Sequence, residues 1–286
     1  MSRVGGGVQV PAAGSWGPDG RRAAVSITFD NLGEAGEIAA GVWPESKPLG
    51  QHSSIENLPI VLSVLEEEGV RSTFFVEGGN TDMYPDAVRS IAERHEIGCH
   101  GLCHELWHEL EPQHERDLLA RALRGYRELG IAHVSGFRPP GGRLTPSSFD
   151  ILREFGFHYV SPAGEAAAVE DGFTVLPFKW ETIDGFHVAP EIRDPPRSSE
   201  QMLDIYQEIV DTLAADGGYL SFVFHPIWLD NKPRIDALRT LIQRFKRDER
   251  LWLAPCGDVS DFIRANARRP NTGSNQSPTL ETVERY

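Results

Sequence analysis

The chain has 286 residues, of which 28 are lysine or arginine and 42 are aspartate or glutamate, so its formal net charge at pH 7 is −14. This acidic balance disfavours nucleic acids and anionic membranes as partners, and no run approaches the roughly 18 apolar residues that a membrane-spanning helix needs. Three cysteines do not make a disulfide framework in a chain of this length, so we expect a cytoplasmic protein.

The two ends of the chain differ in composition from its middle. Residues 1–21 are rich in glycine and proline, show no basic-then-apolar secretion signal, and are expected to form a flexible N-terminal arm. Residues 268–286 are rich in proline, serine, asparagine and threonine, which predicts a disordered tail. Residues 22–267 are long enough for one core and are expected to form a single domain.

Within this domain the chain repeats a strand, a loop and a helix. Runs of β-branched and aromatic residues predict strands, and apolar residues at a helical period predict helices. The expected strands are 24–29, 71–76, 97–99, 132–137, 157–160, 173–177, 218–224 and 251–254, and the expected helices are 55–68, 85–95, 113–129, 146–155, 199–215 and 233–247. The alternation predicts an α/β fold with a parallel sheet, and the number of repeats favours closure into a barrel.

Polar residues that can carry chemistry stand after four of the expected strands. They are Asp30 and Asn31 after the first strand, His100 and His104 after the third, Arg138 after the fourth, and His225 after strand 218–224. Because a parallel barrel brings its C-terminal strand ends to one rim, we expect these side chains to share one site. A carboxylate, several imidazoles and a guanidinium are the groups that metal-assisted hydrolysis uses.

The histidine pair is the strongest single pattern. His100 and His104 are four residues apart, which on one face of a helical turn places their Cβ atoms about 5–6 Å from each other. Two imidazoles at that spacing could bind one metal ion, but the same spacing also occurs between solvated or core histidines. Cys103 could add a thiolate, although a small buried side chain is the commoner role of cysteine.

Taken together, these segments resemble the successive motifs of the polysaccharide deacetylase superfamily, which comprises NodB-homology and carbohydrate esterase 4-like proteins. The matching segments, in the order in which that family has them, are 28–31, 100–104, 137–141 and 224–226. The surroundings of the histidines, residues 95–105, are more similar to the allantoinase-like and cyclic-imidase-like branch. The resemblance implies a distorted (β/α)7 TIM-like barrel and hydrolysis of a carbon–nitrogen bond other than a peptide bond.

The resemblance also implies a role for each residue. Asp30 would be the base that deprotonates a metal-bound water, and Arg138 would keep its carboxylate ionised. His225 would be the acid that protonates the leaving nitrogen. His100 and His104 would bind a divalent metal, zinc by preference, with cobalt, nickel, manganese or iron as alternatives.

The third metal ligand departs from the family pattern, in which a second carboxylate follows the base by one or two residues. Those positions hold Asn31 and Leu32 in this sequence. Asn31 could bind through its uncharged amide oxygen, or Glu34 could approach from the following loop. Alternatively, tight metal binding could be lost, leaving a non-hydrolytic barrel protein such as a binding protein, a lyase or an isomerase.

Aromatic and proline side chains near the strand ends indicate the substrate. The expected substrate-binding residues are Trp43, in loop 31–54, Trp180, in loop 178–187, Trp228 and Pro140. An aromatic-lined pocket suits a small planar or apolar molecule better than a long glycan. We therefore expect hydrolysis of an amide, cyclic imide, ureide or N-acyl group in a small molecule, with a polysaccharide or amino-sugar N-deacetylase as the alternative. The imidase-like resemblance also implies a homo-oligomer.

Overall fold

A computed structural model describes residue 11, residues 15–170 and residues 172–266 of the chain. Its strands are β1 (Ala23–Asp30), β2 (Thr73–Val76), β3 (Glu96–Cys99), β4 (Gly136–Phe137), β5 (Tyr159–Val160), β6 (Ala168–Glu170), β7 (Phe173–Val175), β8 (Phe178–Ile183), β9 (Gly218–Phe224) and β10 (Leu251–Leu253). Its α-helices are α1 (Ala35–Ala39), α2 (Ser53–Glu67), α3 (Asn80–Met83), α4 (Pro85–Ala92), α5 (Pro112–Glu128), α6 (Ser148–Glu154), α7 (Asp184–Val188), α8 (Ser199–Asp216), α9 (Lys232–Arg247) and α10 (Cys256–Asn266). Short 3-10 turns occur at η1 (Trp107–Glu109), η2 (Pro140–Gly142) and η3 (Pro226–Trp228).

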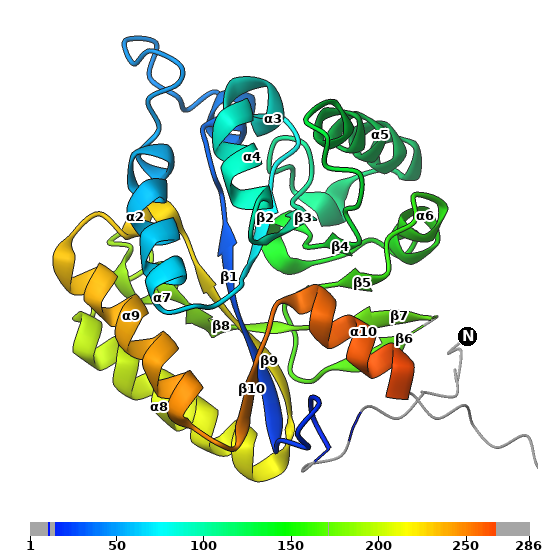
Figure 1. The fold of residues 1–286 in the computed structure, drawn as a ribbon. Helices are drawn as coiled ribbons and strands as arrows, with labels where there is room; N and C mark the ends of the chain where they lie inside the picture. The colour runs from blue at the N-terminus through cyan, green and yellow to red at the C-terminus, as the bar shows by residue number, and fades with distance from the viewer. Residues whose placement is uncertain (1–10, 12–14, 171, 267–286) are drawn as a thin grey trace, which may run out of the picture.

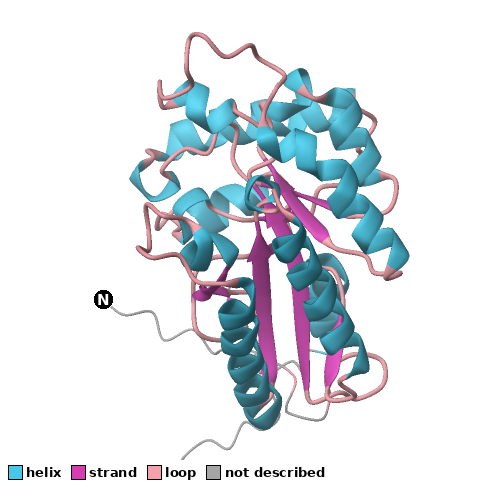
Figure 2. Cartoon of the chain, turned by 90° about the vertical axis from the view of Figure 1, so that its left-hand side faces the viewer, coloured by secondary structure: helices cyan, strands magenta, loops and turns pink. Residues whose placement is uncertain are grey.

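The strands form one curled, mostly parallel sheet with helices packed around its outside (Figure 1, Figure 2). From β5 the order runs through β4, β3, β2, β1 and β9 to β8, and each of these neighbours is parallel. The ends of the curl meet at Phe178, whose N–H donates to the Pro162 carbonyl at 3.1 Å and whose carbonyl accepts from Gly164 at 3.0 Å. This closure confirms the predicted (β/α)7-type barrel.

Alternation along the strands decides which side chains enter the barrel. In β1, every second residue from Ala23 to Phe29 joins the apolar cluster between the sheet and its helices. The intervening residues, from Ala24 to Asp30, therefore face the interior. Since both faces are covered, all eight residues of β1 are buried. By the same alternation, the residues that directly follow β2, β3, β4 and β9 point into the barrel at its C-terminal rim.

The predicted strand 173–177 and the loop after it differ from the structure. Residues Phe173–Val175 form β7, which pairs with β6 in an antiparallel hairpin beside β5, outside the closed ring. The sixth barrel strand is instead β8, in the region predicted as loop 178–187. Its exposed polar residues and a register shift against β9 interrupt the period-2 pattern, so the sequence did not predict it.

Only the end of the predicted N-terminal arm falls within the described residues. Trp16 is fully buried there, and its backbone exchanges hydrogen bonds with Arg21 at 2.9 and 2.6 Å. This part packs on the barrel, so it is not a flexible arm. Residues 1–10, 12–14 and 268–286 lie outside the described residues, and their predicted flexibility stays a prediction. In the described part of the chain, none of the helices combines the length and hydrophobicity that crossing a bilayer requires.

Replacing Gly136 by alanine tests the packing of the barrel interior beside the site. A Cβ on Gly136 would lie 2.0 Å from Cζ of Tyr159, which fills the interior next to β4. We expect the variant to lose about 2 kcal/mol or more of unfolding free energy, measured by urea denaturation, because overpacking a core costs roughly 1–3 kcal/mol. Gly164→Ala, whose Cβ would meet its nearest neighbour at 3.4 Å, is the matched control. Equal stability of both variants would contradict this packing.

Candidate active site

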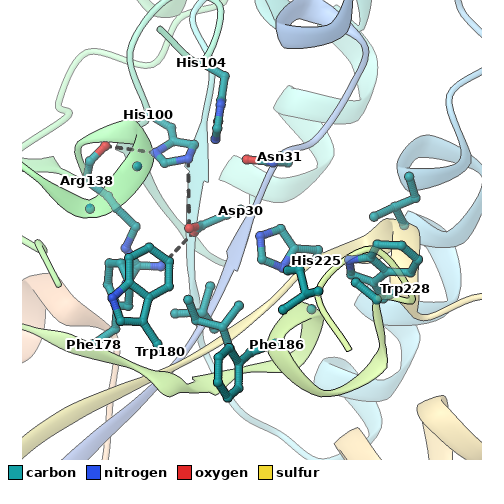
Figure 3. A pocket seen from close by; sticks show the side chains of 18 of the residues that line it. Asp30, Asn31, His100, His104, Arg138, Phe178, Trp180, Phe186, His225 and Trp228 are labelled. Atoms are coloured by element: carbon teal, nitrogen blue, oxygen red, sulfur yellow. Dashed lines mark hydrogen bonds and ion pairs between the residues drawn. The ribbon is translucent and has the colours of Figure 1, made fainter. Parts of the chain in front are cut away.

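A cavity of about 440 Å³ opens at the C-terminal rim of the barrel and collects the polar residues that the sequence predicted (Figure 3). Its polar lining consists of Asp30, Asn31, His100, His104, Arg138, His225 and Glu191. These residues follow different strands and are up to 195 positions apart in sequence, from Asp30 to His225. The predicted meeting of the strand-end residues is therefore seen in the structure.

Asp30 and Arg138 form a buried ion pair at the base of the cavity. Arg138 Nη1 donates to Asp30 Oδ1 at 2.7 Å and to Thr28 Oγ1 at 2.9 Å, while Nε and Nη2 both bond Ser161 Oγ. The guanidinium lies over the rings of Phe75 and Phe178, at 4.1 and 5.1 Å from their centroids. Only 1% of the Arg138 side chain is exposed. The two opposite charges therefore meet where water is largely excluded.

His100 and His104 are adjacent, but a helix does not bring them together. Residues 101–103 form a turn, Gly101 has φ 72° and His104 has φ 57°, so the predicted helical turn is wrong. A left-handed residue reverses the chain more sharply than an α-helix does. The two imidazole centroids nevertheless lie 5.0 Å apart. Gly36 packs closely over this turn, because a Cβ there would lie 2.9 Å from that of His104.

Both imidazoles of the pair are held neutral. Burial lowers the pKa of His100 to about 3 and also lowers the pKa of His104, outweighing the attraction of Asp30 in each case. His100 Nδ1 lies 2.8 Å from the Arg138 carbonyl, which can only accept, so Nδ1 carries the proton. Its Nε2 therefore presents a lone pair to the cavity, 4.0 Å from Asp30 Oδ2. A neutral imidazole oriented in this way is a ready metal ligand.

Asn31 supplies an oxygen beside the two imidazoles. Its amide end points toward the space between the histidines and Asp30 (Figure 3). Oδ1 is buried and has no hydrogen-bond partner among the described residues, which costs about 1–3 kcal/mol for such a group. In the described chain, Asn31 and His104 are the only residues besides glycine with positive φ, at 57° each. Strained backbone and an unpaired acceptor at one point fit a metal ligand.

Glu34 is not available as the third ligand. Its carboxylate is fully buried away from the cavity, where it accepts hydrogen bonds from the Tyr84 hydroxyl and from Gly50 N–H at 2.8 Å. Within residues 15–170 and 172–266, no group of three or more His, Cys, Asp and Glu side chains is arranged to hold a metal ion. The donors that fit a metal here are therefore two imidazoles and the amide oxygen of Asn31.

His225 has a carboxylate partner that the sequence did not predict. Asp184, at the start of α7, accepts from His225 N–H at 2.8 Å and lies 2.7 Å from its Nδ1. Burial alone would lower the pKa of His225, but the charge and hydrogen bond of Asp184 raise it above its usual value. The imidazolium is thereby favoured, with Nδ1 fixed and Nε2 free. The signal for Asp184 was hidden because β8, which precedes it, was not predicted.

The rest of the cavity wall is apolar. It consists of Phe178, Trp180, Ile183, Phe186, Ala189, Ile192, Val223, Ile227 and Trp228 together with backbone at Pro139, Gly141, Gly142 and Gly185. Trp180 and Trp228 were predicted at this site and line the cavity. Trp43 does not, because its loop folds on itself and its Nε1 donates to the Lys47 carbonyl at 3.0 Å. Pro140 is buried against Gly101 outside the lining, so its predicted substrate contact is also not seen.

The arrangement separates two kinds of proton chemistry. Asp30 is a carboxylate beside a fixed cation and can accept a proton, whereas Asp184 raises the pKa of His225, which can donate one. Beside Asp30 lie two neutral imidazoles and the unpaired amide oxygen of Asn31 (Figure 3). Such a site can activate a water molecule on one side of a bond and protonate a leaving group on the other.

A sequence model of a known protein family matches one half of the chain. The sequence model of the family described as polysaccharide deacetylase matches residues 18–160. FGM2, a peptidoglycan deacetylase-like protein of Gibberella zeae, is 29% identical over 102 residues, which are 35% of this chain and 30% of that protein. The chain spans 30% to 40% of the length of the curated relatives it matches.

Solved structures match a larger share of the chain. The crystal structure of a candidate polysaccharide deacetylase from Mycobacterium smegmatis has a TM-score of 0.79 and 26% identity, covering 96% of this chain and 100% of that chain. Puue allantoinase has a TM-score of 0.74 and 21% identity, covering 90% and 94%. At the latter identity the likeness concerns the fold alone.

Asp184→Asn should lower the pKa of His225, since burial then acts without the opposing charge of Asp184. Because the folded-state pKa is raised, the pair stabilises the fold fully below the unfolded value of about 6.5 and ceases to do so as the pH rises through the folded value. In the variant, we expect His225 to titrate at lower pH in NMR spectra. The extra stability of the wild type at pH 5.5 relative to pH 8.5 should also shrink. An unchanged titration would contradict the coupling.

Proposed function

The chain belongs to the polysaccharide deacetylase family, and we propose that it is a metal-dependent hydrolase of a non-peptide carbon–nitrogen bond in a small molecule. The observation that carries this proposal is the content of one cavity. An ion-paired carboxylate, two neutral imidazoles and a buried, unpaired amide oxygen meet there, together with a histidine whose pKa Asp184 raises. An amide, a cyclic imide, a ureide and an N-acyl group all contain the bond in question.

We assign His100, His104 and Asn31 as the metal-binding residues. A divalent ion held by these residues would polarise the substrate carbonyl and make a water molecule more acidic. Two nitrogens and one oxygen suit zinc, and also cobalt, nickel, manganese or iron. An amide oxygen carries no charge, so the affinity should be lower than with a carboxylate at the same position.

The side chains of the protein then divide the proton transfers. Asp30 accepts a proton from the attacking water, whose oxygen adds to the carbonyl carbon, and Arg138 holds the Asp30 carboxylate in place through its 2.7 Å hydrogen bond. As the carbon–nitrogen bond breaks, His225 gives its Nε2 proton to the departing nitrogen. Asp184 holds Nδ1 of His225 and so keeps that proton directed at the cavity. An amide or N-acyl group gives a carboxylic acid and an amine. A cyclic imide gives a carboxylic acid and an amide on one molecule, and a cyclic ureide gives a carboxylic acid and a urea group.

The apolar wall supports a small substrate. A cavity of about 440 Å³ falls within the roughly 300–1,000 Å³ range of small-molecule sites. Away from the polar cluster, its lining side chains offer few hydrogen-bonding groups, the indoles of Trp180 and Trp228 and the carboxylate of Glu191. Sugar hydroxyls buried there would lose water without gaining partners, which is unfavourable. An apolar ring or branched acyl group would gain from the same contact.

A polysaccharide or amino-sugar N-deacetylase is the second candidate. The family match and the name of the Gibberella zeae relative favour it. Indole rings can also stack on sugar faces, and Trp180 is 50% exposed at the cavity mouth, where a longer chain could lie. Both candidates share the same bond type and the same polar residues, and they differ in what occupies the apolar wall.

Two variants should separate metal binding from proton transfer. His104→Ala removes a ligand, so we expect loss of both bound metal and turnover. Asp30→Asn leaves the ligands intact, so metal should remain while kcat falls by about 100-fold or more, as expected for loss of a general base. Metal content is measured by elemental analysis after dialysis. His114→Ala, on the exposed side of α5, should change neither quantity. Full activity in chelator-treated, metal-free wild type would refute metal dependence.

The class of substrate can be tested by comparing substrates and by replacing a residue of the apolar cavity wall. We expect a small amide or imide bearing an apolar ring to be hydrolysed with a higher kcat/KM than N-acetylglucosamine oligomers. Phe186→Ala should reduce that kcat/KM by about tenfold, the equivalent of about 1.4 kcal/mol of lost contact. Trp43→Ala, which removes an aromatic ring outside the cavity, is the control and should have no effect. Faster release of acetate from the glycan oligomer would favour the second candidate.

A further inference from the structure

Glu77 is a buried carboxyl group that the proposed reaction does not use. It follows β2 with the inward parity of Phe75, and only 1% of it is exposed. Among the described residues it forms no ion pair with a lysine, arginine or histidine. Burial raises the pKa of Glu77 to about 8, and the nearby charge of Asp30 acts in the same direction. Burying a carboxyl group without an ion-pair partner is unfavourable, so we expect Glu77 to have a function in the protein.

One side-chain contact of Glu77 is on the loop that carries Asn31, and the other is on α3 (Asn80–Met83). Glu77 Oε2 accepts a hydrogen bond from the Leu32 N–H at 3.3 Å and another from Asn80 Nδ2 at 2.8 Å. Asn80 in turn packs against Gly33, where a Cβ would lie 2.6 Å from its Oδ1. The carboxyl group therefore holds the backbone immediately after Asn31 and the side chain that supports the following residue.

The opposite edge of the same peptide unit is held as well. Ser54, in the first turn of α2, donates from Oγ to the Asn31 carbonyl at 2.9 Å. The Asn31 carbonyl and the Leu32 N–H belong to one planar peptide group. With both edges bonded, this plane cannot rotate, and the ψ angle of Asn31 is fixed. The left-handed conformation of Asn31, which an unsupported residue would leave, is maintained in this way.

We propose that Glu77 is a positioning residue for the Asn31 ligand. By fixing the peptide plane between Asn31 and Leu32, Glu77 directs the unpaired Asn31 Oδ1 at His100 and His104. This inference rests on the proposed function, because it takes the amide oxygen to be a metal ligand. It assigns to Glu77 an effect on metal affinity and ligand geometry, and no direct contact with substrate.

The test measures Co²⁺ binding to the full chain by titration and by visible absorption. Glu77→Leu removes the acceptor, so we expect at least a tenfold loss of Co²⁺ affinity and an altered absorption spectrum. Glu77→Gln keeps an acceptor oxygen and should restore the affinity to within threefold of the wild type. In an Asn31→Ala background, Glu77→Leu should change the affinity by less than twofold, since the ligand that it positions is absent.

Two further variants separate positioning from general stability. Glu96→Leu removes another hydrogen-bonded carboxyl group, at the opposite end of the barrel, and should lower stability without changing Co²⁺ affinity. If Glu77→Leu does not fold, Ser54→Ala loosens the same peptide plane and should weaken Co²⁺ binding, again only when Asn31 is present. If Glu77→Leu lowered the Co²⁺ affinity equally with and without Asn31, the inference about Glu77 would be overturned, while the assignment of the metal site would stand. A wild type that binds no Co²⁺ at His100 and His104 would instead refute the proposed function.

Discussion

The buried ion pair between Arg138 and Asp30 is the interaction on which the upper half of the barrel depends. A guanidinium removed from water must have its donors satisfied, and here the partners are Thr28 and Asp30 on β1 and Ser161 directly after β5. The rings of Phe75 and Phe178 pack against the guanidinium and help to exclude water. Removing either charge would leave the other buried and unpaired, which typically costs about 3–5 kcal/mol. Arg138 therefore links the fold to the chemistry of the site, because it holds Asp30, the proposed base, and also connects β1 to the residue after β5.

Environment, more than residue type, separates the roles of the histidines. His100 and His225 both lie in the cavity, yet burial lowers the pKa of His100 to about 3 while Asp184 raises that of His225 above its usual value. One imidazole thus presents a lone pair and the other a proton under the same conditions. Groups of one kind whose pKa values are moved apart are a general mark of acid–base assignment. The neutral pair beside Asn31 and the charged pair with Asp184 follow this rule.

Strand alternation made much of the site predictable from the sequence. Asp30, His100, Arg138 and His225 each follow a buried strand, and a parallel barrel leaves such residues only one rim to share. The turn between the histidines was mistaken for a helix because spacing alone does not distinguish the two, although Gly101 adopts a conformation that favours a turn. The remaining features depend on tertiary contacts, which no local sequence pattern encodes. These features are the pairing of Asp184 with His225 and the contact of Glu77 with the loop after Asn31. The loop fold that keeps Trp43 and Glu34 out of the cavity is another.

The continuous segment 178–186 has a consequence for how this protein could change. Phe178, Trp180, Ile183 and Phe186 form much of the apolar wall, and Asp184 within the same run sets the protonation of His225. Replacing Ile183 would alter substrate fit and shift the backbone of Asp184 at once, so a new specificity there would bring a new pH optimum with it. Ile192, which lines the cavity from outside this segment and is 61% exposed, is free of that link. During evolution, substrate preference should therefore change first at exposed residues such as Ile192 and last at Ile183, beside Asp184.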